Sequence, residues 1–139
     1  KESTDARQKF FETGEIVYIK QMPDVDENSN QLRKEAYEYY CTSRGLCPNY
    51  GENRMAVISR DTRRSFDITD QIKLLSPRPY LAIAGAKALT FGLSKIAFER
   101  ASEPKEFFEI EGATHVGLYD KEEYVNPAIV KLTEFYKEK

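Results

Sequence analysis

The feature that most constrains the fold is a short apolar run bracketed by prolines and a glycine. Pro77 and Pro79 lead into Tyr80–Ala84, and Gly85 ends the run. Because its apolar residues follow one another without polar alternation, the run is typical of a β-strand buried on both faces, as in parallel sheets. Such a strand needs neighbours at its edges, so the sequence predicts an α/β fold with a mostly parallel sheet.

The residues after this strand predict a helix and then a second strand. Helical spacing of apolar residues is seen at Leu93, Ile96, Ala97 and Ala101. Pro104 ends this helix, and Phe107–Ile110 forms the next strand. A strand, a helix and a strand within about thirty residues make a βαβ crossover, whose strands are parallel and whose connection is nearly always right-handed. A terminal amphipathic helix follows, with one face formed by Val125, Ile129, Leu132 and Tyr136.

The chain changes character near residue 76, because residues 1–76 are polar and irregular. This first part predicts a helix over Asp5–Thr13 that Gly14 ends, a strand over Ile16–Ile19, a helix over Asn30–Thr42 and a loop over 45–51. We therefore expect a single partial domain over residues 1–139. In it, a helical and irregular connecting segment (1–76) precedes a C-terminal β-α-β-α unit (77–139).

Composition and charge exclude several classes of function. Hydrophobic residues make up 40% of the chain and charged residues 32%, which is typical of a globular protein. A net charge of −2 gives no field that would attract nucleic acid or an anionic membrane surface. No apolar stretch approaches the ~20 residues that cross a bilayer, and we expect a cytoplasmic protein.

One local basic run stands out against this balance. It consists of Arg54, Arg60, Arg63 and Arg64, and the acidic residues Asp61 and Asp67 flank its second half. We interpret the run as a solvated loop.

The cysteines and the sole histidine do not form a metal-binding pattern. Cys41 and Cys47 are too far apart for a C-x-x-C motif, and His115 has no second histidine to pair with. We expect no metal and no cofactor. Two free thiols are the default in a cytosolic protein, while a bridge remains open for an oxidising compartment.

His115 lies in the segment Gly112–Gly117, just past the carboxyl end of the second strand. In open α/β sheets, ligands bind outside the carboxyl ends of the strands, so this loop is in the reactive position. Position alone does not establish a function, and a surface histidine without a task is the simpler interpretation.

Three segments carry a more specific resemblance. Ser76–Gly85 resembles the seventh strand of α/β-hydrolases with its lead-in, Glu103–Ile110 resembles the eighth, and Gly112–Asp120 is similar to the histidine loop of a bacterial, dienelactone-hydrolase-like subgroup. The helix after Tyr124 fits the last helix of that fold. The close resemblance covers about residues 74 to 138, and Glu35–Arg54 is similar to the same subgroup less specifically.

The resemblance implies the C-terminal portion of an α/β-hydrolase fold and a Ser, acid, His triad with the serine on a G-x-S-x-G elbow. His115 matches the triad histidine, which would act as general base. No serine stands at the elbow spacing among Ser3, Ser29, Ser43, Ser59, Ser65, Ser76, Ser94 and Ser102. We expect the nucleophile upstream of this chain.

The triad acid is a departure from the family pattern. Members of this family commonly carry Asp a few residues after the glycine matching Gly85, but Ala86–Phe91 contains no carboxylate and Leu89 stands about where the Asp would be. The acid either comes from elsewhere or has been lost. Asp120 is the nearest alternative, and we favour for it a capping role at the final helix. Asp67 and Asp70 are likewise expected in turns or caps.

Two functions follow from the resemblance. In the first, the chain belongs to a hydrolase that acts on a small-molecule ester, thioester or related acyl bond. In the second, it is a non-catalytic relative that acts through self-association or a complementary half. The unpaired edge of Tyr80–Ala84 favours association in either case.

Overall fold

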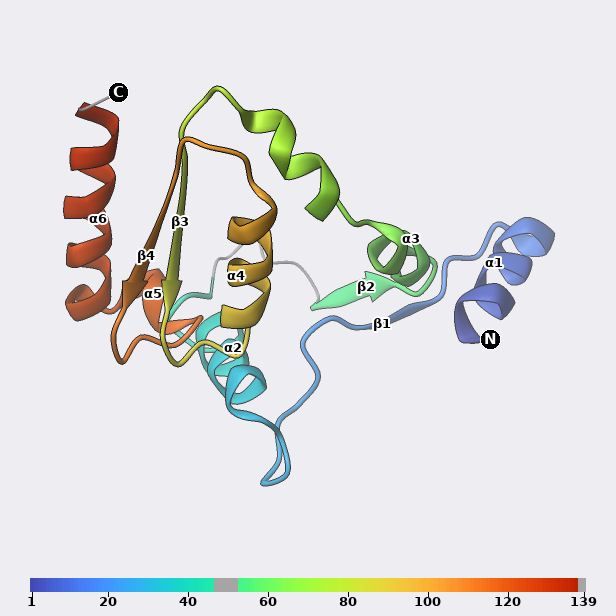
Figure 1. Ribbon diagram of the computed structural model, residues 1–139. Helices are drawn as coiled ribbons and strands as arrows, with labels where there is room; N and C mark the ends of the chain where they lie inside the picture. Colours follow the sequence, from blue (N-terminus) through green and yellow to red (C-terminus); the bar gives the residue numbers. More distant parts are fainter. Residues whose placement is uncertain (47–52, 138–139) are drawn as a thin grey trace. The chain divides into compact units, whose positions relative to one another are not determined.

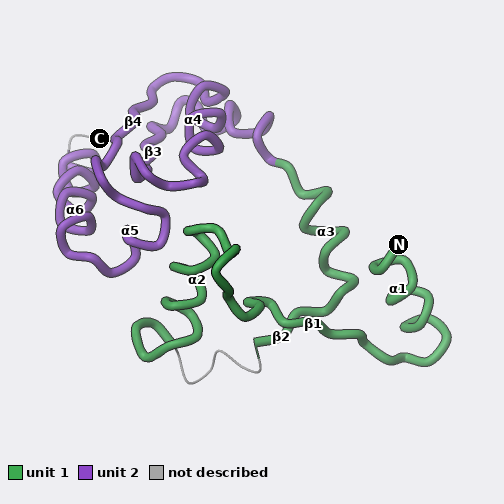
Figure 2. The backbone as a smooth tube through the Cα atoms, turned by 90° about the horizontal axis from the view of Figure 1, so that it is seen from below, with its two compact units in different colours: residues 1–67 green, residues 68–139 purple. Residues whose placement is uncertain are grey.

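The computed structural model describes residues 1–46 and 53–137, which form two compact units, Lys1–Asp67 and Ile68–Lys139 (Figure 2). The loop expected over residues 45–51 lies mostly outside the described residues. Cys41 is a half-buried free thiol, and the second cysteine, Cys47, also lies outside them. Among the described residues, none of the helices combines the length and the apolar character that crossing a membrane requires.

The second unit is built on a pair of parallel strands. Strand β3 (Tyr80–Gly85) pairs with β4 (Lys105–Ile110) in a register that runs from Tyr80↔Lys105 to Gly85↔Ile110. Helix α4 (Phe91–Arg100) connects them, so the predicted βαβ crossover is confirmed. Figure 1 shows α4 on one side of the two strands and α6 (Glu122–Lys137) on the other.

The side chains of β3 are covered unequally on its two faces. Ala82 and Ala84 are buried, whereas Leu81 and Ile83 are half-buried. The predicted burial on both faces is therefore complete only on the face that carries Ala82 and Ala84. The small side chains on this face allow close packing.

Helix α4 is fixed to β4 by aromatic and basic side chains. The rings of Phe91 and Phe98 meet Phe107 edge to face, with centroids 5.8 Å and 5.4 Å from it. The ammonium group of Lys105 donates to the carbonyls of Phe98 (2.9 Å) and Ala101 (2.8 Å). A cation at this end satisfies the unpaired carbonyls that a helix leaves in its last turn.

The terminal helix α6 packs through a different face from the one the sequence pattern indicates. Phe135 is its buried apolar residue, and Lys131 forms an ion pair with Glu106 on β4. Ile129 and Tyr136, which belong to the expected apolar face, are exposed. The ion pair and the ring of Phe135 set the rotation of α6, and its apolar stripe stays at the surface.

The entrance to each strand carries a proline. The bonds Ser76–Pro77 and Glu103–Pro104 are cis, and the hydroxyl of Ser76 donates to the carbonyl of Glu103 at 2.9 Å. Ahead of Ser76 lies a 3-10 helix, η1 (Thr69–Leu75), in which Asp70 forms an ion pair with Arg100 at 2.8 Å. This contact links η1 to α4 within the second unit.

The first unit contains the three elements that its sequence predicts. Helix α1 (Glu2–Thr13) ends at Gly14, whose φ of 72° is left-handed and whose N–H donates to the carbonyl of Phe10 at 2.8 Å. Strand β1 (Tyr18–Lys20) begins later than expected. Helix α2 (Gln31–Cys41) starts after Asn30, whose side chain accepts the N–H of Arg33 at 2.9 Å.

Two further elements of the first unit have no clear sequence signal. Strand β2 (Arg54–Ala56) pairs antiparallel with β1, and helix α3 (Ser59–Ser65) follows it directly. Val57, between them, is fully buried, and its carbonyl accepts the hydroxyl of Ser3 on α1 at 3.4 Å.

Candidate functional site

Two loops meet at the carboxyl edge of the parallel strands. One follows β3 and leads to α4; the other follows β4 and contains His115. Backbone hydrogen bonds join them, from Ala86 N–H to the carbonyl of Ile110 (3.0 Å) and from Lys87 N–H to the carbonyl of Ala113 (2.9 Å). These two hydrogen bonds therefore hold the histidine loop against the loop after β3.

Gly85 is required where the two loops touch. A Cβ atom at this position would lie 2.3 Å from the carbonyl oxygen of Ala113, a separation that real side chains do not reach. The last residue of β3 is thus in backbone contact with the histidine loop.

His115 stands between two anchored neighbours. Ala113 is 0% exposed and Val116 is 1% exposed, while the imidazole itself is half-buried. The hydroxyl of Thr114 accepts the N–H of Gly117 at 3.0 Å, which starts the short helix α5 (Gly117–Asp120). The backbone on each side of the ring is held, so the ring has a defined place at the edge of the sheet.

Both ring nitrogens of His115 hydrogen-bond to hydroxyl groups. Oγ1 of Thr90 lies 2.9 Å from Nδ1, and the hydroxyl of Tyr119 lies 2.9 Å from Nε2. The Tyr119 ring meets the imidazole edge to face at a centroid distance of 5.5 Å. In the part of the chain that the structure describes, these hydroxyls rather than a serine or a carboxylate are the partners of the imidazole.

This arrangement does not fix which of the two ring nitrogens carries the proton. A hydroxyl can donate or accept, whereas a carboxylate only accepts and thereby holds the proton on the nitrogen that faces it. A hydroxyl also carries no charge to stabilise an imidazolium. The two hydrogen bonds therefore orient the ring. Which nitrogen carries the proton depends on the group that approaches Nε2.

The two positions considered for the triad acid, Leu89 and Asp120, lie in the turn before α4 and at the end of α5. Leu89 precedes Thr90 in the turn before α4, and its side chain is 63% exposed. Asp120 is the last residue of α5, and the carbonyl of Lys121 accepts the first α6 bond, from Val125 N–H at 2.9 Å. Asp120 thus lies directly before the residue whose carbonyl opens α6, and its expected capping role stays a prediction.

Thr90 and Tyr119 are site residues that the sequence reasoning did not identify. Tyr119 lies four residues after His115, a spacing that brings side chains together in a helical turn. Thr90 directly follows the position matched to the family's acid. Attention to hydroxyls as well as carboxylates in that loop would have found it.

Among the described residues, no group of three or more His, Cys, Asp or Glu side chains is arranged to hold a metal ion.

Comparison with known proteins gives relatives but no family description. No protein-family model matches the chain. PA2218 of Pseudomonas aeruginosa, an uncharacterised protein, is 34% identical over 118 residues, which cover 83% of this chain and 32% of that protein. YcjY of Escherichia coli, also uncharacterised, is 30% identical over 141 residues, which cover 97% of this chain and 44% of that protein.

Solved structures define the fold. The crystal structure of PA2218 matches with a TM-score of 0.87 and 28% identity over 98% of this chain and 42% of that one. DcsB, solved with its substrate analogue, matches with a TM-score of 0.81 and 21% identity, and its match covers 98% of this chain and 48% of that one. The α/β hydrolase GrgF of Penicillium sp. sh18 matches with a TM-score of 0.70 and 22% identity, over 98% and 46%.

The chain therefore shares its fold with part of each of these proteins, among them the α/β hydrolase GrgF. It spans less than half the length of each protein that it matches. At 21% and 22% identity, the likeness to DcsB and GrgF concerns the fold alone.

Proposed function

We propose that the chain is the C-terminal portion of an α/β-hydrolase-like enzyme that cleaves an ester, thioester or related acyl bond, with His115 as general base. The observation that carries the proposal is the imidazole held at the carboxyl edge of parallel strands, with a hydroxyl 2.9 Å from each ring nitrogen. The proposed nucleophile is a serine outside this chain.

The hydrogen bond at Nε2 supports a hydroxyl nucleophile. A general base must have a bare Nε2, so the ring proton sits on Nδ1 and donates to Thr90. Tyr119 then donates its O–H to Nε2 at 2.9 Å, the distance at which a serine hydroxyl would be activated. Tyr119 is 41% exposed and belongs to a four-residue helix, and in the proposed enzyme a serine hydroxyl takes the place of its hydroxyl at Nε2.

In the proposed reaction, His115 takes the serine proton as the oxygen attacks the acyl carbon, and returns it to the leaving group. Thr90 orients the ring through Nδ1. Because Thr90 adds no negative charge, the imidazolium that forms is stabilised less than in a Ser, His, Asp triad.

The proposal is tested on the full-length protein with a fluorophosphonate probe and short-chain p-nitrophenyl esters. We expect covalent labelling and ester turnover in the parent protein, and loss of both in His115→Ala. Glu111→Gln is the matched control, because Glu111 lies in the same loop and its side chain is exposed. Absence of labelling in the parent protein would contradict the proposal and favour a non-catalytic relative that acts through association.

A further inference from the structure

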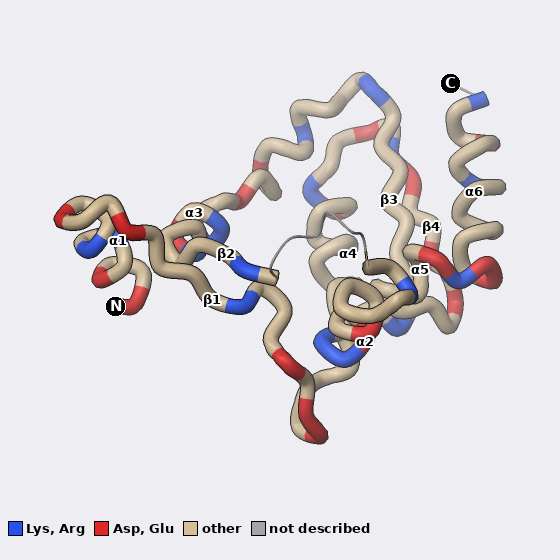
Figure 3. The backbone as a smooth tube through the Cα atoms, turned by 180° about the vertical axis from the view of Figure 1, so that it is seen from behind, with Lys and Arg blue, Asp and Glu red and all other residues tan. Residues whose placement is uncertain are grey.

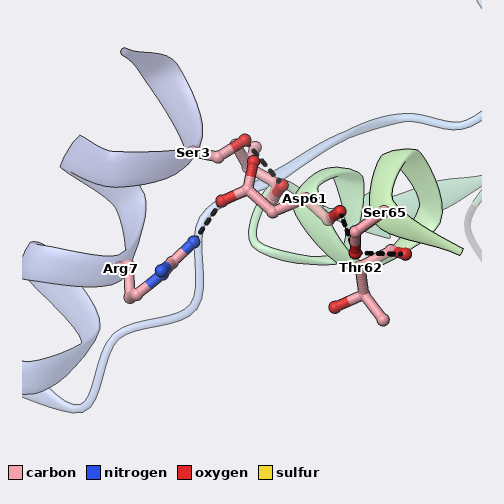
Figure 4. Close-up of polar contacts among 6 residues, drawn as sticks. Ser3, Arg7, Asp61, Thr62 and Ser65 are labelled. Atoms are coloured by element: carbon pink, nitrogen blue, oxygen red, sulfur yellow. Dashed lines mark hydrogen bonds and ion pairs between the residues drawn. The ribbon is translucent and has the colours of Figure 1, made fainter.

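Helix α3 presents two chemically different faces. Ile58, at its start, and Asp61, Thr62 and Ser65 line a hollow of about 680 Å³ on the α1 side, together with Arg7, Phe10 and Phe11. Figure 4 shows Asp61 directed at Arg7, with which it forms an ion pair. The hydroxyl of Ser65 donates back to the carbonyl of Asp61 at 3.0 Å. The acidic residue of α3 is thus engaged by α1.

The other face of α3 carries only arginines. Arg60, Arg63 and Arg64 follow the i, i+3, i+4 spacing of one helix face, and they line a separate hollow of about 440 Å³ with Met55 of β2. Figure 3 marks basic positions on α3 and β2. Three of the four arginines of the basic run therefore lie on a helix rather than in the loop that the sequence suggested, but Arg63 and Arg64 are exposed as expected, and all three line one open hollow.

Two of these charges have no acidic partner within the described residues. Arg60 forms an ion pair with Glu2. The guanidinium group of Arg63 donates to the sulfur of Met55 at 3.2 Å, and among the described residues the guanidinium group of Arg64 has no side-chain hydrogen bond or ion pair. Like charges at this spacing destabilise a helix, and a bound anion would remove that cost.

We propose that this arginine face binds the phosphate group of a small organic molecule. A guanidinium group matches phosphate oxygens with paired N–H donors. The uncompensated charges of Arg63 and Arg64 match a phosphate monoester, which carries about −1.5 to −2 at pH 7. The thioether of Met55 offers apolar contact to the organic part, and the hollow falls in the size range of small-molecule sites. The site is independent of His115 and of the proposed hydrolysis.

The probes are inorganic phosphate and phenyl phosphate, titrated into the full-length protein by calorimetry and by phosphorus NMR, with acetate as a monoanion. We expect phosphate to bind more tightly than acetate and phenyl phosphate more tightly than phosphate. The double variant Arg63→Gln/Arg64→Gln should weaken phosphate binding by roughly tenfold or more. Arg63→Lys/Arg64→Lys keeps the charge but not the paired donors, so its affinity for phosphate should lie between that of the parent protein and that of the double Gln variant. It serves as the test if the double Gln variant folds poorly.

The control is Arg78→Gln, because Arg78 is exposed and belongs to the other unit. Vesicles of phosphatidylcholine with added phosphatidic acid distinguish a lipid headgroup from a free phosphate. Arginine-dependent binding to either source supports the phosphate site. Two results would overturn the proposal. One is that neither probe nor vesicle binds at about 10 mM phosphate, and the other is that Arg78→Gln loses as much phosphate binding as the Arg63 and Arg64 variants.

Discussion

Oγ1 of Thr90 lies 2.9 Å from Nδ1 of His115, so the partner of this ring nitrogen is a neutral hydroxyl. A carboxylate both fixes the tautomer and stabilises the imidazolium. Thr90 orients the ring without supplying charge. The position directly before Thr90, Leu89, is the one that the family resemblance assigns to the acid. In the proposed enzyme, Thr90 would therefore act as an orienting partner that carries no charge.

The first prediction concerns Thr90 as a positioning residue. Thr90→Val keeps the shape but removes the hydrogen bond to Nδ1, and kcat/KM for ester hydrolysis should fall about 2- to 10-fold, in line with the net worth of one hydrogen bond. Thr90→Ser keeps a hydroxyl and should restore most of the activity.

The tautomer gives a readout that a purely structural role of Thr90 would not change. His115 is the sole histidine of the chain, so nitrogen-15 NMR of the selectively labelled chain reports one imidazole. The balance between the Nδ1–H and Nε2–H forms should change in Thr90→Val and not in Thr90→Ser. Identical spectra and rates in all three proteins would mean that Thr90 does not position the ring.

The second prediction restores the missing charge. Leu89 is 63% exposed in the turn before α4, so Leu89→Asp adds a carboxylate without opening a cavity. If the added carboxylate reaches His115, kcat/KM should rise, with an upper bound of about 10⁴, the loss seen when a triad acid is neutralised. Leu89→Asn controls for the polar change. Equal rates in the Asp and Asn variants would show that this position cannot serve as the acid.

The third prediction ranks His115 above every carboxylate of the chain. His115→Ala removes the general base and should lower kcat/KM by orders of magnitude. Asp120→Asn and Asp67→Asn should cost far less, because neither is expected to assist the imidazole. Steady-state kinetics on the full-length protein decide the order. If Asp120→Asn proved as damaging as His115→Ala, Asp120 would be the acid.

The β3-α4-β4 crossover could be predicted because prolines and a glycine bracket its apolar runs. Periodicity alone could not set the rotation of α6. The apolar stripe of Ile129 and Tyr136 is regular, yet Phe135 and the Lys131–Glu106 ion pair turn another face to the strand. The face that α6 turns to the strand therefore depends on Glu106 of β4, which is distant in sequence.

The position of the candidate site could be predicted where a residue type occurs once in the chain. His115 stands out as the sole histidine past a strand end. Thr90 could not be found by searching for a carboxylate, because a hydroxyl takes its place. The arginines of α3 look balanced in sequence by Asp61, and only the fold reveals that Arg7 of α1 engages this acid.

The fourth prediction tests the contact that seats the histidine loop. Gly85→Ala would place Cβ 2.3 Å from the carbonyl oxygen of Ala113, so backbone must shift and unfolding stability should fall by about 1–3 kcal/mol. Activity should fall with it, since the loop carries His115. Gly92→Ala is the matched control: no atom lies within 4 Å of its Cβ, and alanine inside α4 should stabilise by about 0.4–1 kcal/mol. Denaturant unfolding of both variants separates the steric effect of a methyl group at position 85 from the general effect of replacing glycine with alanine.

The fifth prediction concerns the second edge of β3, which among the described residues pairs with no strand other than β4. An apolar strand with an open edge associates with other strands, so the 139-residue chain by itself should self-associate in size-exclusion chromatography and light scattering. The exposed apolar stripe of α6 is the competing cause. Ile129→Lys and Tyr136→Lys should therefore leave the association in place if β3 drives it, because both residues lie on α6 and away from the strand backbone. In the full-length protein, further strands of the hydrolase sheet should cover this edge and abolish the association. A sharp, concentration-independent monomer of the chain alone would contradict the open edge, and a monomer produced by the α6 lysines would assign the association to the helix.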